Sequence, residues 1–168
     1  MSQDKLKKCL NEGEKKGVRH QGLRKILPSP EKSKSFLAKS LHNFQAITDF
    51  HELGYSDWSA SAAFYSLYHG LLAILAKRGY ESRNQSCTFA LIEDWISRKE
   101  IRNLDSEDIK EIFDKDVAFD LEHSNKILDI RERMQYSTQT SLEEEEFLLL
   151  KTRTKELLDK IRLEIERE

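Results

Sequence analysis

Residues 58–76 read WSASAAFYSLYHGLLAILA, and this stretch decides the fold. Apolar side chains occupy nearly every face of the helix that it predicts, which is typical of a helix at the centre of a bundle. Ser56 or Asp57 is expected to cap its start, and Gly79 to end it. Its most apolar part, residues 60–76, is shorter than the roughly 20 residues that cross a bilayer, so it predicts a buried helix and no membrane contact.

Amphipathic segments flank this central helix on both sides. Ser29 followed by Pro30 predicts an N-cap and a proline at the first helical position of a long helix that ends at Gly54. The same periodicity predicts further helices at residues 85–99, 105–113, 117–136 and 141–168, the second capped by Asp105 or Ser106 and the last capped near Ser141. No segment alternates as a strand does. The sequence therefore predicts an all-α protein, an up-and-down antiparallel bundle of four to five long helices over residues 30–168, with a short basic helical extension at 1–29.

Charge is distributed unevenly along the chain. The formal net charge is -2, with 28 Lys and Arg against 30 Asp and Glu. The first 39 residues carry a net charge of +7 and the remainder carries -9. A basic end on an acidic body can contact phosphates, and it can equally contact the acidic body of its own or a partner subunit.

The spacing of the cysteines and the absence of known motifs limit the kinds of chemistry that the sequence predicts. Cys9 and Cys87 lie far apart and have no metal ligands at zinc-site spacing, so we expect reduced thiols in a cytoplasmic protein. The polar N-terminus carries no apolar segment of the secretory kind. No glycine-rich phosphate loop, nucleophile elbow or paired-histidine motif occurs, so we predict no cofactor and no metal centre.

Two polar clusters lie at or beside the central helix. Tyr65 and His69 are one turn apart on it, where a polar group needs a hydrogen bond or a subunit interface. They are interpreted as satisfied core or interface residues, with a role in a site as the alternative. The loop at residues 80–85, which contains Asn84, leads into a helix N-terminus that can hold an anion, although a capped loop explains the same residues.

A third cluster ends the helix predicted at residues 117–136. Arginine suits phosphate oxygens in a bidentate manner, whereas glutamine and tyrosine supply neutral hydrogen-bonding groups. Two arginines in a last helical turn also complement the helix dipole, so a structural role is the alternative. The cluster consists of Arg131, Arg133, Gln135 and Tyr136.

Two segments resemble HEPN-domain proteins. Residues 57–72, DWSASAAFYSLYHGLL, resemble the family's second core helix, in which an aromatic pair and a Tyr/Phe-x-x-x-His turn precede a short glycine-containing loop, here residues 79–82. Residues 128–136, LDIRERMQY, are similar to the arginine-bearing end of the third core helix. The resemblance covers about residues 31–165, and the first thirty residues look like an extension.

The resemblance implies a homodimer whose arginine motifs face each other across the two-fold axis. Many members are metal-independent ribonucleases, often toxins, with an Arg-x(4–6)-His motif, in which arginine stabilises the scissile phosphate and histidine handles a proton. Others are non-catalytic partners of small nucleotidyltransferases. Here Arg131 is present, but no histidine follows it at that spacing, and Gln135 and Tyr136 come instead. Glutamine transfers no proton, and tyrosine, with a pKa of about 10, is a poor base at neutral pH, which favours binding over cleavage.

The leading hypothesis is therefore a non-catalytic or weakly active HEPN dimer, working with a small nucleotidyltransferase in a toxin–antitoxin-like module. A nucleotide or RNA phosphate would be bound by Arg131, Arg133, Gln135, Tyr136 and Asn84. Tyr136 is also a candidate for modification by the partner. The first alternative is a metal-independent endoribonuclease toxin that uses Arg131 with His69, which is a better candidate than His123. The second is a purely structural helical interaction module.

Overall fold

The computed structural model describes residues 2–15, 21–113 and 126–167. Helices account for 75% of this part of the chain, which confirms the predicted helical character. The elements are α1 (Ser2–Glu14), β1 (Leu23–Lys25), α2 (Pro30–Glu52), α3 (Ser56–Lys77), β2 (Tyr80–Ser82), α4 (Gln85–Ser97), α5 (Ser106–Ile112), α6 (Lys126–Tyr136) and α7 (Glu144–Glu166).

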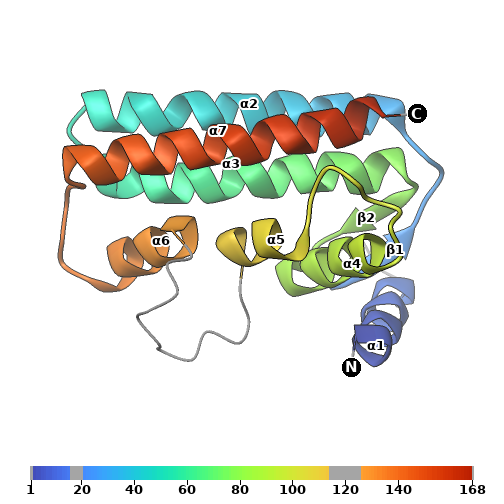
Figure 1. The fold of residues 1–168 in the computed structure, drawn as a ribbon. Helices are drawn as coiled ribbons and strands as arrows, with labels where there is room; N and C mark the ends of the chain where they lie inside the picture. Colours follow the sequence, from blue (N-terminus) through green and yellow to red (C-terminus); the bar gives the residue numbers. More distant parts are fainter. Residues whose placement is uncertain (1, 16–20, 114–125, 168) are drawn as a thin grey trace.

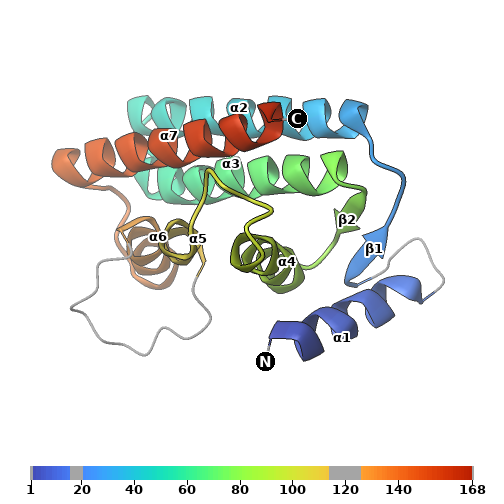
Figure 2. The ribbon, with the colours of Figure 1, turned by 45° about the vertical axis from the view of Figure 1, so that its right-hand side comes forward.

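The helices form two layers (Figures 1 and 2). The long helices α2, α3 and α7 make one layer, and the shorter α4, α5 and α6 lie beneath α3. Helix α2 runs opposite to α3, whereas α7 runs in the same direction as α3 (Figure 1). The packing is thus bundle-like. Together, α4, α5 and α6 return the chain from the end of α3 to the start of α7, as a single long helix would.

Helix α3 is the centre of the molecule, as its composition predicts. Of its residues, all of which the structure describes, only Trp58 and Tyr65 are exposed. Small residues let α2 approach it closely: the Ser40 and Ser66 hydroxyls each donate to the other residue's carbonyl oxygen, at 2.5 and 2.9 Å. These bonds satisfy polar groups in a buried interface, where leaving them unpaired would be costly.

Two of the predicted helix caps are confirmed and two are wrong. Ser29 accepts a hydrogen bond from the Lys32 N–H at 3.2 Å, with Pro30 in the first turn of α2. Asp105 caps α5 in a reciprocal capping box. Neither Ser56 nor Asp57 caps α3, whose N-cap is Tyr55, because the Ser56 hydroxyl instead accepts from the Leu142 N–H at 2.8 Å.

The start of α7 differs from the prediction, and part of the helix predicted before it lies outside the described residues. Helix α7 has Glu143 at its N-cap rather than a residue near Ser141, and it makes no side-chain cap hydrogen bond. Of the helix predicted at residues 117–136, the structure describes 126–136 as α6. Residues 114–125, with His123 among them, lie outside the described part.

The expectation of a chain without strands is wrong. Strands β1 and β2 pair antiparallel, with Leu23 opposite Ser82 and Lys25 opposite Tyr80. The pairing continues at Gly79, whose carbonyl accepts from the Ile26 N–H at 2.9 Å and whose φ is +83°. Strands of three residues are too short to show the alternation by which a strand is recognised in a sequence.

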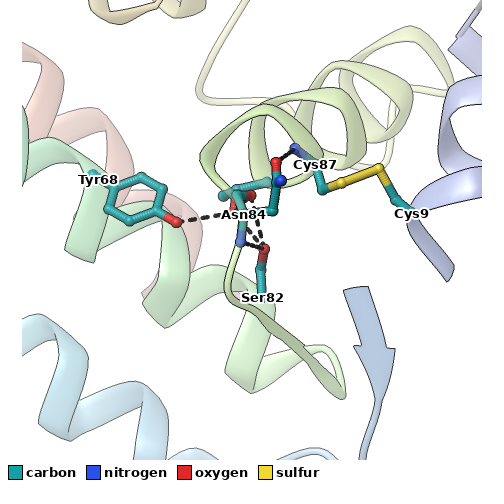
Figure 3. The surroundings of a disulfide bond; sticks show 6 residues. Cys9, Tyr68, Ser82, Asn84 and Cys87 are labelled. Carbon is teal, nitrogen blue, oxygen red and sulfur yellow. Dashed lines mark hydrogen bonds between the residues drawn. A yellow bond between two sulfur atoms is a disulfide. The ribbon is translucent and has the colours of Figure 1, made fainter. Parts of the chain in front are cut away.

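The expectation of two reduced thiols is also wrong, because Cys9 and Cys87 form a disulfide across 78 positions of sequence. The bond joins α1 to the first turn of α4 (Figure 3). Helix α1 also lies directly against β1: a Cβ at Gly13 would come within 1.7 Å of the Leu23 carbonyl oxygen. Residues 2–14 are therefore tied to the bundle by a covalent bond and by close backbone packing.

Helix α3 has the length and composition of a membrane span. However, 78% of its most apolar window is buried inside the protein, as in the core helix of a soluble bundle. Its apolar surface already packs against the other helices.

Candidate functional site

Arg131 lies in the middle of α6, on the side that faces α3. Its guanidinium carbon is 3.7 Å from the centroid of the Phe64 ring, which is close enough for a cation–π interaction. Phe64 is fully buried and in turn stacks on Tyr68, with 5.8 Å between ring centroids. The apolar column under Arg131 holds its guanidinium plane in one orientation.

Among the described residues, no carboxylate lies within ion-pair distance of the Arg131 guanidinium. Burial lowers the pKa of Arg131, while electrostatic interactions with Tyr65, Glu132 and Tyr136 oppose that shift. Arginine stays protonated at neutral pH, so this site presents a half-buried cation with tyrosines close by.

His69 lies on the other side of Tyr65, one turn along α3. Its Nδ1 is 2.7 Å from the Tyr65 carbonyl oxygen, and the Asn43 amide lies 3.2 Å from the same nitrogen. Because a carbonyl oxygen only accepts, the proton is assigned to Nδ1, and neutral His69 then carries its lone pair on Nε2.

The surroundings of His69 favour the neutral ring. Burial, followed by the charge of Lys39, lowers its pKa, and the hydrogen bond to the Tyr65 carbonyl only partly offsets this. Phe36 on α2 stacks on the ring, with 6.3 Å between centroids. His69 is thus a held, uncharged imidazole at the surface, consistent with the polar interface residue that the sequence predicts and with a proton acceptor.

The other residues predicted at the end of α6 have different environments. Arg133 forms an ion pair with Glu146 on α7, so its charge is already compensated. Gln135 is exposed, and Tyr136 is 80% exposed. Only Tyr136 is brought into electrostatic contact with Arg131.

Asn84 lies at the start of α4, and among the described residues no hydrogen bond joins it to Arg131. Its side chain accepts from the Cys87 N–H at 3.0 Å and so caps the helix. Around it, the Thr88 hydroxyl lies 2.8 Å from Ser82 Oγ and 3.3 Å from the Tyr68 hydroxyl (Figure 3). The predicted anion-binding loop is thus a capped loop in which the side-chain oxygen of Asn84 is already used.

Two partners of the site were not predicted from the sequence. The Phe64 ring lies under Arg131, and the Asn43 side chain of α2 lies beside His69. Phe64 precedes Tyr65 in the quoted segment, but nothing in the spacing indicates that a residue 67 positions later rests on its ring. Asn43 gives no signal, since an amide on an amphipathic helix is ordinarily solvated.

Within the described ranges, no three His, Cys, Asp or Glu side chains gather in a way that suits a metal ion. No model of a known protein family matches the chain, and a search of curated proteins finds no match either. The resemblance to HEPN domains therefore remains a prediction.

Proposed function

We propose that this protein binds the phosphate of a nucleotide or of RNA at a cluster formed by Arg131, Tyr65, His69 and Tyr136, hereafter the Arg131 cluster. The observation that carries the proposal is the unpaired, half-buried Arg131 guanidinium, oriented by Phe64 and flanked by tyrosines. A planar cation that forms no ion pair among the described residues suits a phosphate, to which it can donate two parallel hydrogen bonds.

The exposed aromatic side chains nearby suit the bases of a single-stranded nucleic acid. Tyr136 is 80% exposed and Tyr65 is 43% exposed. Tyrosine rings next to an arginine are the elements on which single strands stack without sequence preference. Of the nearby carboxylates, Glu146 pairs with Arg133, whereas Glu132 interacts electrostatically with Arg131.

The wider assignment is part of the same proposal. The chain would be a cytoplasmic HEPN-type homodimer, an up-and-down bundle that acts with a small nucleotidyltransferase in a toxin–antitoxin-like module. Tyr136, whose side chain stands free of the fold, is the candidate residue for modification by that partner. Arg133 would contribute less to binding than the sequence suggests, because Glu146 compensates its charge.

A second candidate function, the metal-independent endoribonuclease, is favoured by one observation. The pKa of His69 is lowered, which favours the neutral ring. The hydrogen bond from Nδ1 to the Tyr65 carbonyl then leaves Nε2 as the nitrogen that carries the lone pair. Such a nitrogen can accept the proton of an RNA 2′-hydroxyl as that oxygen attacks the phosphate, while Arg131 stabilises the charge that develops. In this mechanism both residues contact the reacting atoms.

Arg131→Ala is expected to weaken binding of a fluorescent single-stranded RNA of twelve nucleotides at least about tenfold, because a charge-assisted contact to phosphate is lost. Fluorescence anisotropy in EDTA measures the affinity. The matched control is Arg162→Ala, which removes an exposed arginine of α7 and should change affinity less than about twofold. Equal affinity in wild type and Arg131→Ala would instead support a purely structural module.

The same RNA separates binding from cleavage. Gel analysis after prolonged incubation in EDTA should show intact RNA if the protein only binds it. If the protein cleaves RNA, the products should carry 2′,3′-cyclic phosphates, and both His69→Ala and Arg131→Ala should abolish their formation. Cleavage that survives in both variants would remove the Arg131 cluster from the mechanism.

A further inference from the structure

A pocket of about 380 Å³ lies between α2, the second half of α3 and the loop that joins β2 to α4. This is within the range of roughly 300–1,000 Å³ that small-molecule sites occupy. It does not include Arg131, but it adjoins the Arg131 cluster at His69, on which the pocket residue Phe36 stacks.

The pocket has an apolar floor and a cationic rim. Phe36, Leu72 and Ala76 supply apolar surface from the two helices, and Tyr80 adds an aromatic side chain from β2. Three cations, Lys32, Lys39 and Arg83, stand against a single acid, Glu81. Deep apolar surface beside a few convergent polar groups is the usual composition of a ligand site.

The cations at the rim differ in their pairing. Lys32 is 3.6 Å from Glu81, which also lies 3.9 Å from Arg24, so two cations share this acid. Lys39 and Arg83 form no ion pair among the described residues. The pocket therefore carries two uncompensated positive charges, one contributed by α2 and the other by the loop after β2.

Hydrogen bonds and the disulfide fix the position of the loop that carries Arg83. The Arg83 N–H donates to the Gly22 carbonyl at 3.2 Å, next to β1. One residue earlier, Ser82 bonds to Thr88, and the Cys9–Cys87 disulfide fixes the first turn of α4 (Figure 3). The pocket wall is thus preformed, which reduces the entropy that a ligand must overcome on binding.

We propose that this pocket binds a small organic anion that has one carboxylate or phosphate group on an apolar body. The anionic group would lie between Lys39 and Arg83, and the apolar body would cover Phe36 and Leu72. The charges exclude a cationic ligand, and the apolar floor disfavours a bare inorganic ion. This site is independent of the proposed function at Arg131.

The test uses 8-anilinonaphthalene-1-sulfonate as the probe, and its uncharged analogue N-phenyl-1-naphthylamine. Isothermal titration calorimetry should show one sulfonate per chain in the wild type. The double variant Lys39→Ala/Arg83→Ala should weaken sulfonate binding at least about tenfold and change binding of the uncharged analogue less than about twofold. Competition with octanoate and with octyl phosphate then distinguishes a carboxylate ligand from a phosphate ligand.

Further variants locate the probe and separate this site from the Arg131 cluster. Ser35→Trp fills the pocket from an exposed position of α2 and should abolish binding of both probes, whereas Ser35→Ala should not. Lys34→Ala removes an exposed lysine of the same helix outside the pocket and should leave affinity unchanged, as should Arg131→Ala. Wild-type affinity in the double variant, or in Ser35→Trp, would overturn the proposal.

Discussion

Replacing Glu164 by alanine is expected to lower the free energy of unfolding by about 3–5 kcal/mol, because it removes a buried carboxylate that pairs with partly buried cations and accepts several hydrogen bonds. The Glu164 side chain is fully inaccessible to solvent. Its carboxylate pairs with both Arg78 and Arg167 at 3.1 Å. It thus joins α7 to the end of α3.

The same carboxylate also fixes the loop between α4 and α5. It accepts from the backbone N–H groups of Arg102 and Asn103, at 3.1 and 3.2 Å, and from the Asn103 amide at 2.9 Å. Alanine at position 164 would leave these donors unpaired, and an unsatisfied buried donor costs roughly 1–3 kcal/mol. One residue therefore connects three segments that are distant in sequence.

Urea denaturation followed by circular dichroism measures the effect. Glu166→Ala, which removes an exposed glutamate two residues along the same helix, is the control and should change stability by less than about 0.5 kcal/mol. A loss for Glu164→Ala as small as that of the control would show that the carboxylate is not a structural anchor.

The stabilisation by Glu164 should depend on pH in a defined direction. Burial alone would raise its pKa, but the hydrogen bonds from Arg102 and Asn103 and the charge of Arg167 outweigh burial and lower it. The carboxylate therefore stabilises the fold fully above its unfolded pKa, and this contribution is lost as the pH falls through the lower, folded pKa. The stability difference between wild type and Glu164→Ala should accordingly shrink below about pH 4.

Reduction of the Cys9–Cys87 disulfide is expected to cost about 2–4 kcal/mol of stability, because the bond closes a long loop in the unfolded chain. The two cysteines are 78 positions apart. Urea midpoints with and without dithiothreitol measure the change, and Cys9→Ser/Cys87→Ser should match the reduced wild type. Hydrogen exchange should increase first in residues 2–14, whose helix is tied to α4 by this bond. Identical midpoints in both conditions would contradict the prediction.

The disulfide bears on the expected cytoplasmic location, which stays a prediction. Disulfides persist in oxidising compartments, and in cytoplasm such a bond is ordinarily transient or redox-sensing. Sequence spacing gave no indication of the pairing, because Cys9 and Cys87 come together only when α1 packs across β1 onto α4. Gly13, which permits that packing, has an obvious role only once the Leu23 carbonyl is seen beside it.

Local signals predicted local structure well. Ser29, Pro30 and Asp105 act as expected because a helix cap depends on residues within one turn. Ser56 has the same chemistry as Ser29, yet its hydroxyl bonds to a residue 86 positions away, so its local signal was misleading. The two strands were missed for a related reason, since each is only three residues long and its partner is remote.

In the candidate site, too, residue types could be predicted from the sequence, whereas contacts between distant segments could not. Arg131, Tyr65 and His69 were singled out by residue type and helical spacing, and in the structure Tyr65 interacts electrostatically with Arg131 and accepts a hydrogen bond from His69. Asn84 was grouped with them on hydrogen-bonding capacity alone, but it caps α4 instead. The contact that gives Arg131 its character, the face of Phe64, depends on how α6 packs against α3 and so required the structure.

The proposed function depends most on the binding of phosphate by Arg131. It is tested most directly by NMR of the arginine side-chain Nε–Hε groups in ¹⁵N-labelled protein, during titration with adenosine 5′-monophosphate. The proposal predicts that the Arg131 resonance, assigned by its loss in Arg131→Lys, shifts saturably with the nucleotide and does not shift with adenosine. An unmoved Arg131 resonance at saturating nucleotide, or an equal shift with adenosine, would contradict it.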